Sequence, residues 1–424
     1  MELDRSVAVL VVKVGRYPLH HGGVGVIRSL GRLGVPVYAI TEDRFTPAAV
    51  SRYLRGRFVW PTTGREDPGE LVAGLLRIGE QIGEWMGGRP IALPTDDEAA
   101  VLLAEHAPRL AERFAFPAVP AALPRLLADK FALSELCRAH GVPTPAAARP
   151  GSVDELRRAA AELGYPVVLK NAEPWSRLAA PAVASTTVVR SEAELLARAA
   201  AWTAMPQVLV QEYLPDRDGT VDWISQPYCD GASVAQPVFT GVKVRSWPPR
   251  AGVTTLAFST PNEELAEMTA GFCRSIGYRG IADLDWRFDP VDGRYQLLDF
   301  NPRVGAQFRL FQTEAGVDLA RALHLDLTGR PTPAGAPVAG RVLRVENLDM
   351  PALWAEWRAT GHRPRHRLPG KAELAWLAAD DLLPAAVAAA RSGRLAVGML
   401  SRGLRRALRN RGPAPMAPSR YRLL

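Results

Sequence analysis

Two segments within residues 280–303 carry side chains that suit a magnesium and phosphate site. Asp285 lies in the first segment, and Asp299, Asn301 and Arg303 lie in the second. Carboxylate and carboxamide oxygens are the hard ligands that Mg²⁺ prefers, and the ion usually keeps further positions for water and phosphate oxygens. We therefore interpret Asp285, Asp299 and Asn301 as metal ligands, with the Arg303 guanidinium beside the phosphates.

The same two segments are predicted to be paired strands. Residues 280–288 and 295–303 are rich in alternating apolar side chains, and the Asp292-Gly293 pair between them favours a two-residue hairpin turn. Asp285 and Asp299 would then lie on adjacent strands, and Asn301 would share a face with Asp299, because side chains alternate along a strand. A charged rim on an ordinary hairpin is the alternative, so the metal hypothesis depends on residues upstream.

Two lysines lie upstream, at the ends of predicted elements. Lys130 opens an amphipathic segment that is predicted to be a helix ending at Gly141. Lys170 closes the apolar run of residues 165–170, which is typical of a buried strand. An unpaired buried ammonium is costly, so a lysine at this position needs an anionic partner, and a polyphosphate would supply one.

The apolar residues 208–215 predict a further strand that runs into a proline. Such a strand end can offer backbone groups to the edge of an adenine and, shortly afterwards, a carboxylate to a ribose. The strand end spans Gln211 to Leu214, and Asp218 is the candidate for the ribose. For Asp218, the alternative is an aspartate in an exposed loop.

A pair of cations precedes the metal segments. Lys243 and Arg245 are two residues apart on a predicted strand, so they would share a face and could present two positive charges to the phosphates or to an acyl phosphate. Arg250, on the loop that follows, could recognise a substrate carboxylate with its planar fork of donors. The alternative is a solvated edge strand whose charges block further pairing.

The order of these residues is similar to that of the ATP-grasp superfamily, over residues 120 to 330. The resemblance implies that ATP and Mg²⁺ (or Mn²⁺) are cofactors. It implies roles for the residues in three groups: Lys130, Lys170, Gln211, Glu212, Tyr213, Leu214 and Asp218 would bind the nucleotide, Asp285, Asp299 and Asn301 the metal, and Arg303, Lys243 and Arg245 the transferring phosphoryl group. The chain departs from many members in the loop after Lys170, which is not glycine-rich. The hydroxyls of Ser185 to Thr187 could cover the nucleotide there instead.

The fold class implied is α/β, in three regions. Residues 1–120 predict a Rossmann-like pre-ATP-grasp domain, because a βαβ pattern spans residues 7–40. Its glycines lack the Gly-x-Gly-x-x-Gly spacing, so NAD binding is not expected. Thr95 and Asp97 follow a further strand and could contact the acceptor substrate, with helix capping as the alternative. Residues 121–335 would form the α+β ATP-grasp domain with two subdomains, and residues 336–424 a helical, basic C-terminal region.

Composition excludes several classes of protein. The chain of 424 residues has 47% hydrophobic and 23% charged residues, which is typical of a globular protein. Its net charge of +8 lies in the nine arginines after residue 390, where no acidic residue occurs, so the remainder is nearly neutral and nucleic acid is not an expected partner. Three cysteines without metal-ligand spacing indicate a reduced, cytoplasmic protein. No transmembrane segment and no secretory signal are predicted.

The basic tail allows two interpretations. Leu400, Leu404 and Leu408 lie along one face of a predicted amphipathic helix, which could contact anionic lipid or a carrier protein. The plainer alternative is a helix packed on the domain with its arginine face in water. The first interpretation would make peripheral membrane contact part of the function.

The superfamily resemblance implies an ATP-dependent carboxylate–amine ligase that releases ADP. ATP would convert a small-molecule carboxylate into an acyl phosphate, and an amine, such as that of an amino acid or peptide, would then displace phosphate. Two alternatives stay open: another phosphoryl-transfer enzyme on the same fold, such as a carboxylase or a kinase-like enzyme, and a membrane-associated nucleotide-binding protein acting through the tail. A homodimer is also considered.

Overall fold

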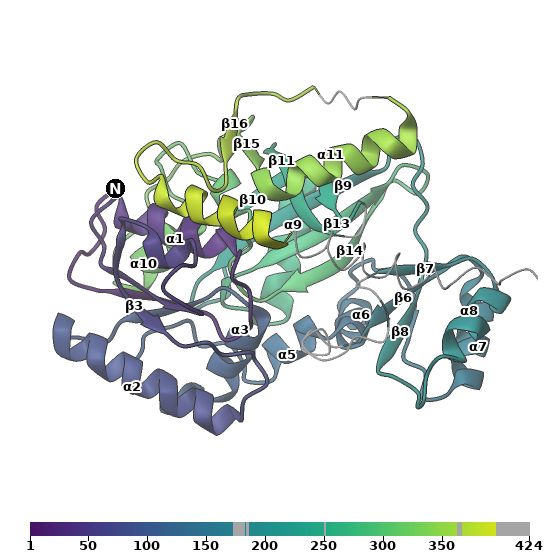
Figure 1. Cartoon of the computed structure of the whole chain (residues 1–424), viewed down its shortest axis with the longest axis horizontal. Coiled ribbons are helices and arrows are strands. Elements are labelled where there is room, and N and C mark those ends of the chain that lie inside the picture. Colours follow the sequence, from purple (N-terminus) through teal and green to yellow (C-terminus); the bar gives the residue numbers. More distant parts are fainter. Residues whose placement is uncertain (173–182, 184–185, 250–251, 363–366, 396–424) are drawn as a thin grey trace, which may run out of the picture.

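The computed structural model describes the whole chain except residues 173–182, 184–185, 250–251, 363–366 and 396–424. The described part is a mixed α/β structure built on three sheets (Figure 1). This confirms the predicted fold class. The predicted amphipathic helix with Leu400, Leu404 and Leu408 lies outside the described residues, as do Arg250 and Ser185.

The N-terminal sheet is parallel and has the strand order β3-β2-β1-β4. Alternate residues of β1 pack into two separate apolar cores, one on each face, as expected for a parallel sheet covered on both sides. The helix after β1 begins at residue 21, where the His20 side chain accepts a hydrogen bond from the Gly23 N–H. The elements are β1 (Val9–Val12), α1 (His21–Gly31), β2 (Val37–Thr41), β3 (Leu54–Val59), α2 (Pro68–Met86), β4 (Ile91–Pro94) and α3 (Asp97–Glu105).

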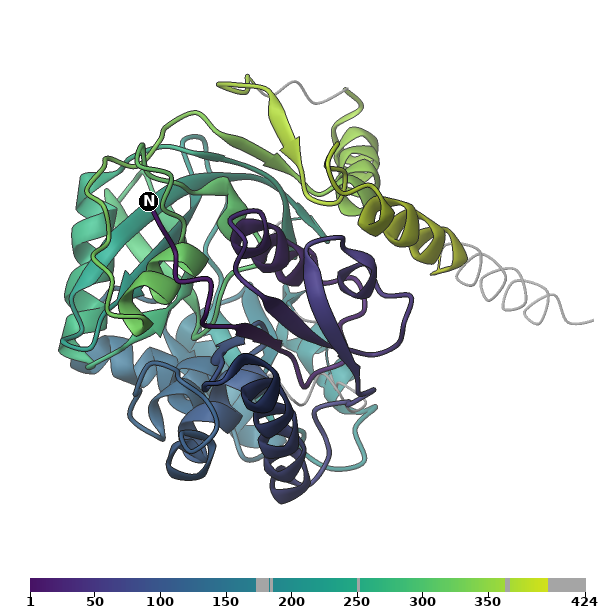
Figure 2. The same ribbon diagram turned by 90° about the vertical axis from the view of Figure 1, so that its left-hand side faces the viewer.

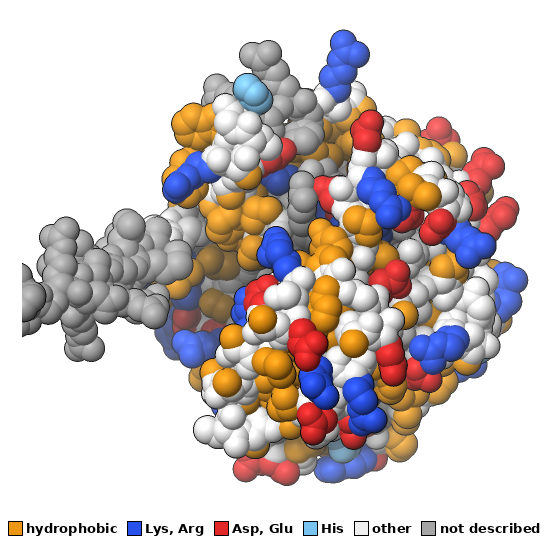
Figure 3. Space-filling view, turned by 90° about the vertical axis from the view of Figure 1, so that its right-hand side faces the viewer, with side chains coloured by type: hydrophobic (Ala, Val, Ile, Leu, Met, Phe, Trp, Pro, Cys, Tyr) orange, Lys and Arg blue, Asp and Glu red, His pale blue; other side chains and the backbone are white. Residues whose placement is uncertain are grey.

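A small sheet forms a lobe at the right of Figure 1. Its strand order is β5-β8-β6-β7, and an apolar core lies between the sheet and two helices. The outer face of this lobe carries interspersed acidic and basic side chains (Figure 3). The elements are β5 (Ala147–Ala148), α7 (Val153–Leu163), β6 (Val167–Asn171), β7 (Thr187–Val189), α8 (Glu192–Ala199) and β8 (Val208–Glu212), preceded by α5 (Leu123–Ala128) and α6 (Lys130–Ala139).

The large sheet has eight strands in the order β14-β13-β9-β10-β11-β15-β16, with β12 also paired to β9. Helix α9 contacts β9 and β10, and α11 contacts β10 and β11. The elements are β9 (Val221–Cys229), β10 (Ala235–Trp247), β11 (Val253–Ser259), α9 (Glu263–Ser275), β12 (Gly280–Ile281), β13 (Asp283–Asp289), β14 (Arg294–Asn301), α10 (Leu319–Leu327), β15 (Val342–Arg344), α11 (Glu346–Thr360) and β16 (Ala372–Leu374).

The structure differs from the sequence predictions in two local features. The β13–β14 hairpin closes at the Asp289–Arg294 pair, so its loop spans residues 290–293 and the predicted two-residue turn is wrong. Gly293 adopts a φ of 61° in that loop, a conformation that favours glycine. The C-terminal region contributes strands β15 and β16 as well as helices.

The C-terminal segment runs along the edge of the N-terminal sheet and α1 (Figure 2). Residues 383–395 are helical, and Arg391 of this helix donates to the Phe45 carbonyl (2.9 Å). No helix among the described residues is long and apolar enough to span a bilayer.

Candidate active site

The β13–β14 pair brings the predicted metal ligands together. Asp285 lies opposite Asp299, and Asn301 lies opposite Asp283 in the register. Asp285 is paired with Lys243 of β10 (Oδ1 to Nζ, 2.7 Å), and Asp299 is paired with Lys130 at the start of α6. Each carboxylate is therefore neutralised by one lysine, and both pairs remain partly exposed.

Lys170 approaches this centre from the small lobe. Burial, and next the charge of Lys130, lower the pKa of Lys170 from its ordinary value to about 8, while Asp299 and Asp285 act in the opposite direction. Lys170 is thus close enough to these groups to interact with them across the two sheets. An anion that arrives between the lobes would stabilise the charged form of this lysine.

Arg303 connects the centre to the N-terminal region. Its Nε donates to Asp97 Oδ1 of α3 (3.1 Å), and its Nη2 donates to Asn301 Oδ1 (3.1 Å). Its Nη1 also lies 3.7 Å from a carboxylate oxygen of Asp283. The planar guanidinium is therefore held from three sides.

Asp283 is a site residue that the sequence analysis missed. Its Oδ1 accepts hydrogen bonds from Gln226 (2.8 Å) and Gln307 (3.0 Å), and its backbone carbonyl accepts one from Asn301 (3.1 Å). Burial, and next the charge of Asp285, raise the pKa of Asp283 to about 6. Its spacing of two residues from Asp285, on the same strand, was the signal that could have identified it.

The donor set fits a cation that arrives with phosphate better than a resident metal. In the part of the chain that the structure describes, no three or more His, Cys, Asp or Glu side chains are grouped to hold a metal ion. Asp285, Asp299 and Asn301 offer two carboxylates and one carboxamide, which leaves most positions of an octahedron to phosphate and water oxygens. These residue types suit Mg²⁺ on that condition.

The predicted adenine residues lie at the end of β8. Gln211 is buried, and Glu212 pairs with Ala146, whose N–H donates to the Glu212 carboxylate (3.2 Å). The Leu214 carbonyl accepts a hydrogen bond from Arg287 (3.2 Å), and Tyr213 is half-buried. Asp218, the predicted ribose residue, lies exposed in a turn, so its role stays a prediction.

The prediction that Lys243 and Arg245 share a face is wrong. The register between β10 and β11 shifts on both sides of Arg245, so simple alternation fails there. The Arg245 guanidinium instead binds Asp349 (2.6 Å) and Glu356 (2.9 Å) of α11. Arg245 therefore attaches α11 to the sheet, and only Lys243 of the two faces the candidate site.

Thr95 and Asp97, the two predicted contacts of the acceptor substrate, have different surroundings. The Thr95 hydroxyl donates to the Val12 carbonyl (3.1 Å), which ties β4 to β1. The capping of α3 belongs to Asp96, whose Oδ1 accepts from the Ala99 N–H (2.8 Å). Asp97, at the first position of the helix, pairs with Arg303.

Comparison with known proteins gives relatives of several activities. No family model matches the chain. It is 23% identical to the D-aspartate ligase of Enterococcus faecium (strain Aus0004) over 313 residues, which cover 71% of this chain and 73% of that protein. It is 28% identical to the D-alanine–D-alanine ligase of Pseudomonas entomophila (strain L48) over 187 residues, 42% of this chain and 56% of that protein. A biotin carboxylase of Allochromatium vinosum is 26% identical over 229 residues, 49% of this chain and 47% of that protein, so the chain spans about half the length of the last two relatives.

Solved structures with the same fold cover most of the chain. The N5-carboxyaminoimidazole synthetase of Staphylococcus aureus has a TM-score of 0.60 at 13% identity and covers 87% of this chain and 94% of its own. The biotin carboxylase domain of a Hydrogenobacter thermophilus 2-oxoglutarate carboxylase, in complex with MgADP, ADP and bicarbonate, has a TM-score of 0.57 at 18% identity and covers 81% and 74%. These findings agree with the resemblance predicted from the sequence: the chain is similar in sequence to ligases and to a biotin carboxylase, and it shares its fold with the two solved structures.

Proposed function

We propose that this protein activates a small carboxylate with ATP, as an acyl phosphate, and joins it to an amine, that of an amino acid or peptide, with release of ADP and phosphate. One observation carries the proposal: Lys130, Lys243 and Lys170 gather around Asp299 and Asp285 at the place where the small lobe meets the large sheet. This arrangement offers cations to a triphosphate and carboxylates to the cation that accompanies it.

ATP would enter between the small lobe and the large sheet. Lys170 and Lys130 would hold its phosphates, and Gln211 to Leu214 would frame the adenine. Before the nucleotide binds, each lysine neutralises the charge of its aspartate. Because the pairs are partly exposed, each ammonium can exchange its carboxylate for a phosphate oxygen at a small cost in free energy. Asp285 and Asp299 then become available as ligands.

Bound Mg²⁺ would neutralise charge on the phosphates and so lower the electrostatic barrier between two anions. Cationic side chains of the protein would neutralise further charge on the phosphates. Lys243 and Arg303 lie on the same side as the predicted ligands, and Arg303 is oriented in advance by Asp97 and Asn301. A preoriented guanidinium stabilises the charge that develops in phosphoryl transfer without reorganising during the step. No protein nucleophile is needed.

A hydroxylamine trap tests the proposal directly. An acyl phosphate reacts with hydroxylamine to give a hydroxamate and phosphate, so the unknown amine can be left out. The full chain, ATP, Mg²⁺ and a panel of carboxylic acids should release ADP and form the matching hydroxamate, detected by mass. An absence of hydroxamate with every acid, while ADP is released, would contradict the ligase mechanism.

A bicarbonate-using reaction is the second candidate, because the relatives include carboxylases. Bicarbonate is itself activated as an anhydride with phosphate, so the same residues would serve it. ADP release that requires bicarbonate and no other acid would favour this candidate. Phosphate that stays on the product, instead of appearing free, would favour a kinase-like reaction. The cytoplasmic location, the homodimer and any membrane contact of the tail remain predictions.

A further inference from the structure

Helix α11 turns its largest apolar side chains toward water. Met350, Trp354 and Trp357 are 68%, 52% and 49% exposed, and their spacing places them on one face of the helix. The residues that α11 buries are Asp349 and Ala352. The helix lies on the outside of the large sheet (Figure 1), where a surface helix usually directs its apolar stripe to the core. α11 has the reverse arrangement.

The acidic side chains of α11 are engaged by the protein itself. Glu346 accepts hydrogen bonds from the backbone N–H groups of residues 375–377. Asp349 and Glu356 both bind the Arg245 guanidinium of β10. These carboxylates attach α11 to the sheet and to the C-terminal segment, and the exposed apolar face is left for another partner.

The end of α11 is basic. From residue 358 to residue 371 the sequence has five Lys and Arg and no Asp or Glu. Arg358, Arg367 and Lys371 lie in the described part and are exposed. The Arg358 guanidinium lies over the Trp354 ring, 4.8 Å from the ring centroid, which is a cation–π contact. The apolar face of α11 therefore continues into a positively charged region.

A second basic stretch starts close to the other end of α11. The C-terminal helix of residues 383–395 lies beside α11 (Figures 1 and 2), and Asn347 of α11 donates to the Ser392 hydroxyl (3.3 Å). Arg394 and Leu395, at the end of that helix, are exposed. From residue 391 on, the sequence has nine Arg and no Asp or Glu. Positive charge therefore lies near both ends of the apolar face.

This charge distinguishes between possible partners. A second copy of the chain would bring two basic regions together, and like charges repel. An anionic surface would be attracted. Trp side chains next to Arg and Lys are typical of the interface of a bilayer, where the ring lies at the level of the headgroups and the cations lie near lipid phosphates.

We propose that α11 binds this protein to an anionic phospholipid surface. The side chains of Met350, Trp354 and Trp357 enter the headgroup region, and the exposed cations beside them contact lipid phosphates. The proposal goes beyond the ligase function and does not rest on it, because none of these residues belongs to the candidate active site. Binding to lipid can be measured without nucleotide.

Vesicle sedimentation of the full chain tests the proposal. The protein is mixed with vesicles of phosphatidylcholine alone, and with vesicles that also contain phosphatidylglycerol. We expect binding to the anionic vesicles, and binding at least about tenfold weaker to the neutral ones, because several Arg and Lys side chains lie near the surface. Added salt should weaken the binding, since exposed charges are screened.

Replacing both Trp residues of α11 separates insertion of the rings from attraction by charge alone. The double variant with Trp354→Gln and Trp357→Gln should bind anionic vesicles at least about tenfold more weakly, because the apolar area of two rings no longer enters the interface. The fold should persist, since both side chains are exposed. Trp85→Gln in α2 is the matched control: Trp85 is 54% exposed, and its variant should bind as the wild type does.

Three outcomes would overturn the proposal. The first is a wild type that does not bind anionic vesicles. The second is equal binding by the wild type and the double variant, which would assign the contact to basic residues alone. The third is a wild type that forms dimers, in sedimentation velocity without lipid, that the double variant does not form, which would make the face a contact between two copies. None of these outcomes changes ADP release, so the ligase proposal is tested separately.

Discussion

The ion pairs of the candidate site and the Arg28–Asp381 pair of the C-terminal junction differ in how far their side chains are exposed to solvent. The C-terminal junction is the set of contacts that residues 373–381 make with α1, Arg309 and Arg341. Lys130 and Asp299 keep 24% and 29% of their side-chain surface exposed. Arg28 and Asp381, at the junction, keep 0% and 1% and are 2.9 Å apart. Arg28 makes three further hydrogen bonds, to the carbonyls of Ala375, Trp376 and Asp381. The Arg28–Asp381 pair is a fixed part of the fold, whereas the site pairs can open when a phosphate arrives.

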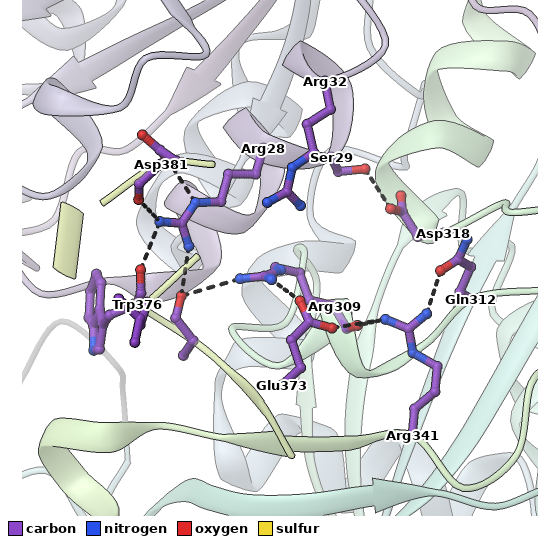
Figure 4. A network of polar contacts seen from close by, with 12 residues as sticks. Arg28, Ser29, Arg32, Arg309, Gln312, Asp318, Arg341, Glu373, Trp376 and Asp381 are labelled. Atoms are coloured by element: carbon purple, nitrogen blue, oxygen red, sulfur yellow. Dashed lines mark hydrogen bonds and ion pairs between the residues drawn. The ribbon is translucent and has the colours of Figure 1, made fainter. Parts of the chain in front are cut away.

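The junction attaches the C-terminal segment to three other parts of the chain. Its acidic residues come from residues 373–381, and its arginines come from α1, from the segment after the site and from the residue before β15 (Figure 4). Glu373 bridges Arg309 and Arg341. Burial, and then the charges of Arg28, Arg32 and Arg341, lower the pKa of Arg309 to about 9. Removing acidic residues here should therefore affect stability before activity.

The largest effect should come from Asp381. Asp381→Ala leaves the Arg28 guanidinium buried without its carboxylate, and we expect the free energy of unfolding to fall by about 3–5 kcal/mol. The adjacent Asp380 is the matched control, because its pair with Arg32 is exposed (33% and 41%) and should contribute about 0–1 kcal/mol. Urea unfolding of both variants measures the difference. Equal losses would show that burial does not distinguish the two pairs.

Substitution of Asp299 should affect activity and leave stability nearly unchanged, in contrast to substitution of Asp381. Asp299→Ala removes a predicted metal ligand from a partly exposed pair, so ADP release should fall by about 10²–10³-fold while the melting temperature changes little. Asp292→Ala, in the exposed loop of the same hairpin, should leave both quantities unchanged. Turnover equal to wild type in the Asp299 variant would remove the metal assignment.

Lys243 and Arg245 give the same contrast within one strand. Lys243→Met should lower ADP release by about 10²-fold, because the residue lies beside Asp285. Arg245→Met should leave turnover nearly unchanged and cost about 1–3 kcal/mol of unfolding free energy, since Asp349 is buried and keeps Arg344 within 3.2 Å. If the Arg245→Met variant lost turnover instead, Arg245 would act on the phosphates, as the alternation of side chains along the strand predicted.

Patterns that act over a few residues predicted most of the elements that carry the site. The start of α6 at Lys130, the strand that ends near Lys170, and the opposition of Asp285 and Asp299 all follow from local punctuation and from side-chain alternation. The orientation of Arg245 was predicted wrongly because a β-bulge depends on the partner strand, and the sequence does not show which strand pairs there.

The remaining features depend on distant parts of the chain. β15 and β16 have three residues each, too few to show a period, and they exist by pairing at the edge of the large sheet. Asp381 lies 353 residues from Arg28 in sequence. The spacing of Asp283 from Asp285 could have marked it as a candidate, but its contacts with Gln226 and Gln307 could not be predicted from the sequence. Composition and spacing contain no record of such contacts.

The smallest effect should appear at Lys170, as a pH dependence of nucleotide binding. In the folded protein its pKa is lowered to about 8, from the ordinary 10.5, so the ammonium loses its proton as pH rises through about 8 while the unfolded chain stays protonated. The native state should therefore gain stability between pH 8 and 10.5, and ATP, by stabilising the ammonium, should bind with proton uptake in that window.

Calorimetric titration with ATP and Mg²⁺ at pH 8.5, in two buffers of different ionisation enthalpy, measures this uptake. We expect a fraction of a proton to be taken up by the wild type and none by Lys170→Met, with an ATP affinity that falls up to about tenfold per pH unit above pH 8 in the wild type alone. Lys130→Met is the control, because it removes a cation that repels Lys170 and should raise the pH at which the affinity begins to fall. A heat of binding that is the same in both buffers would mean that Lys170 does not meet the phosphates, and that the small lobe binds the nucleotide through other groups.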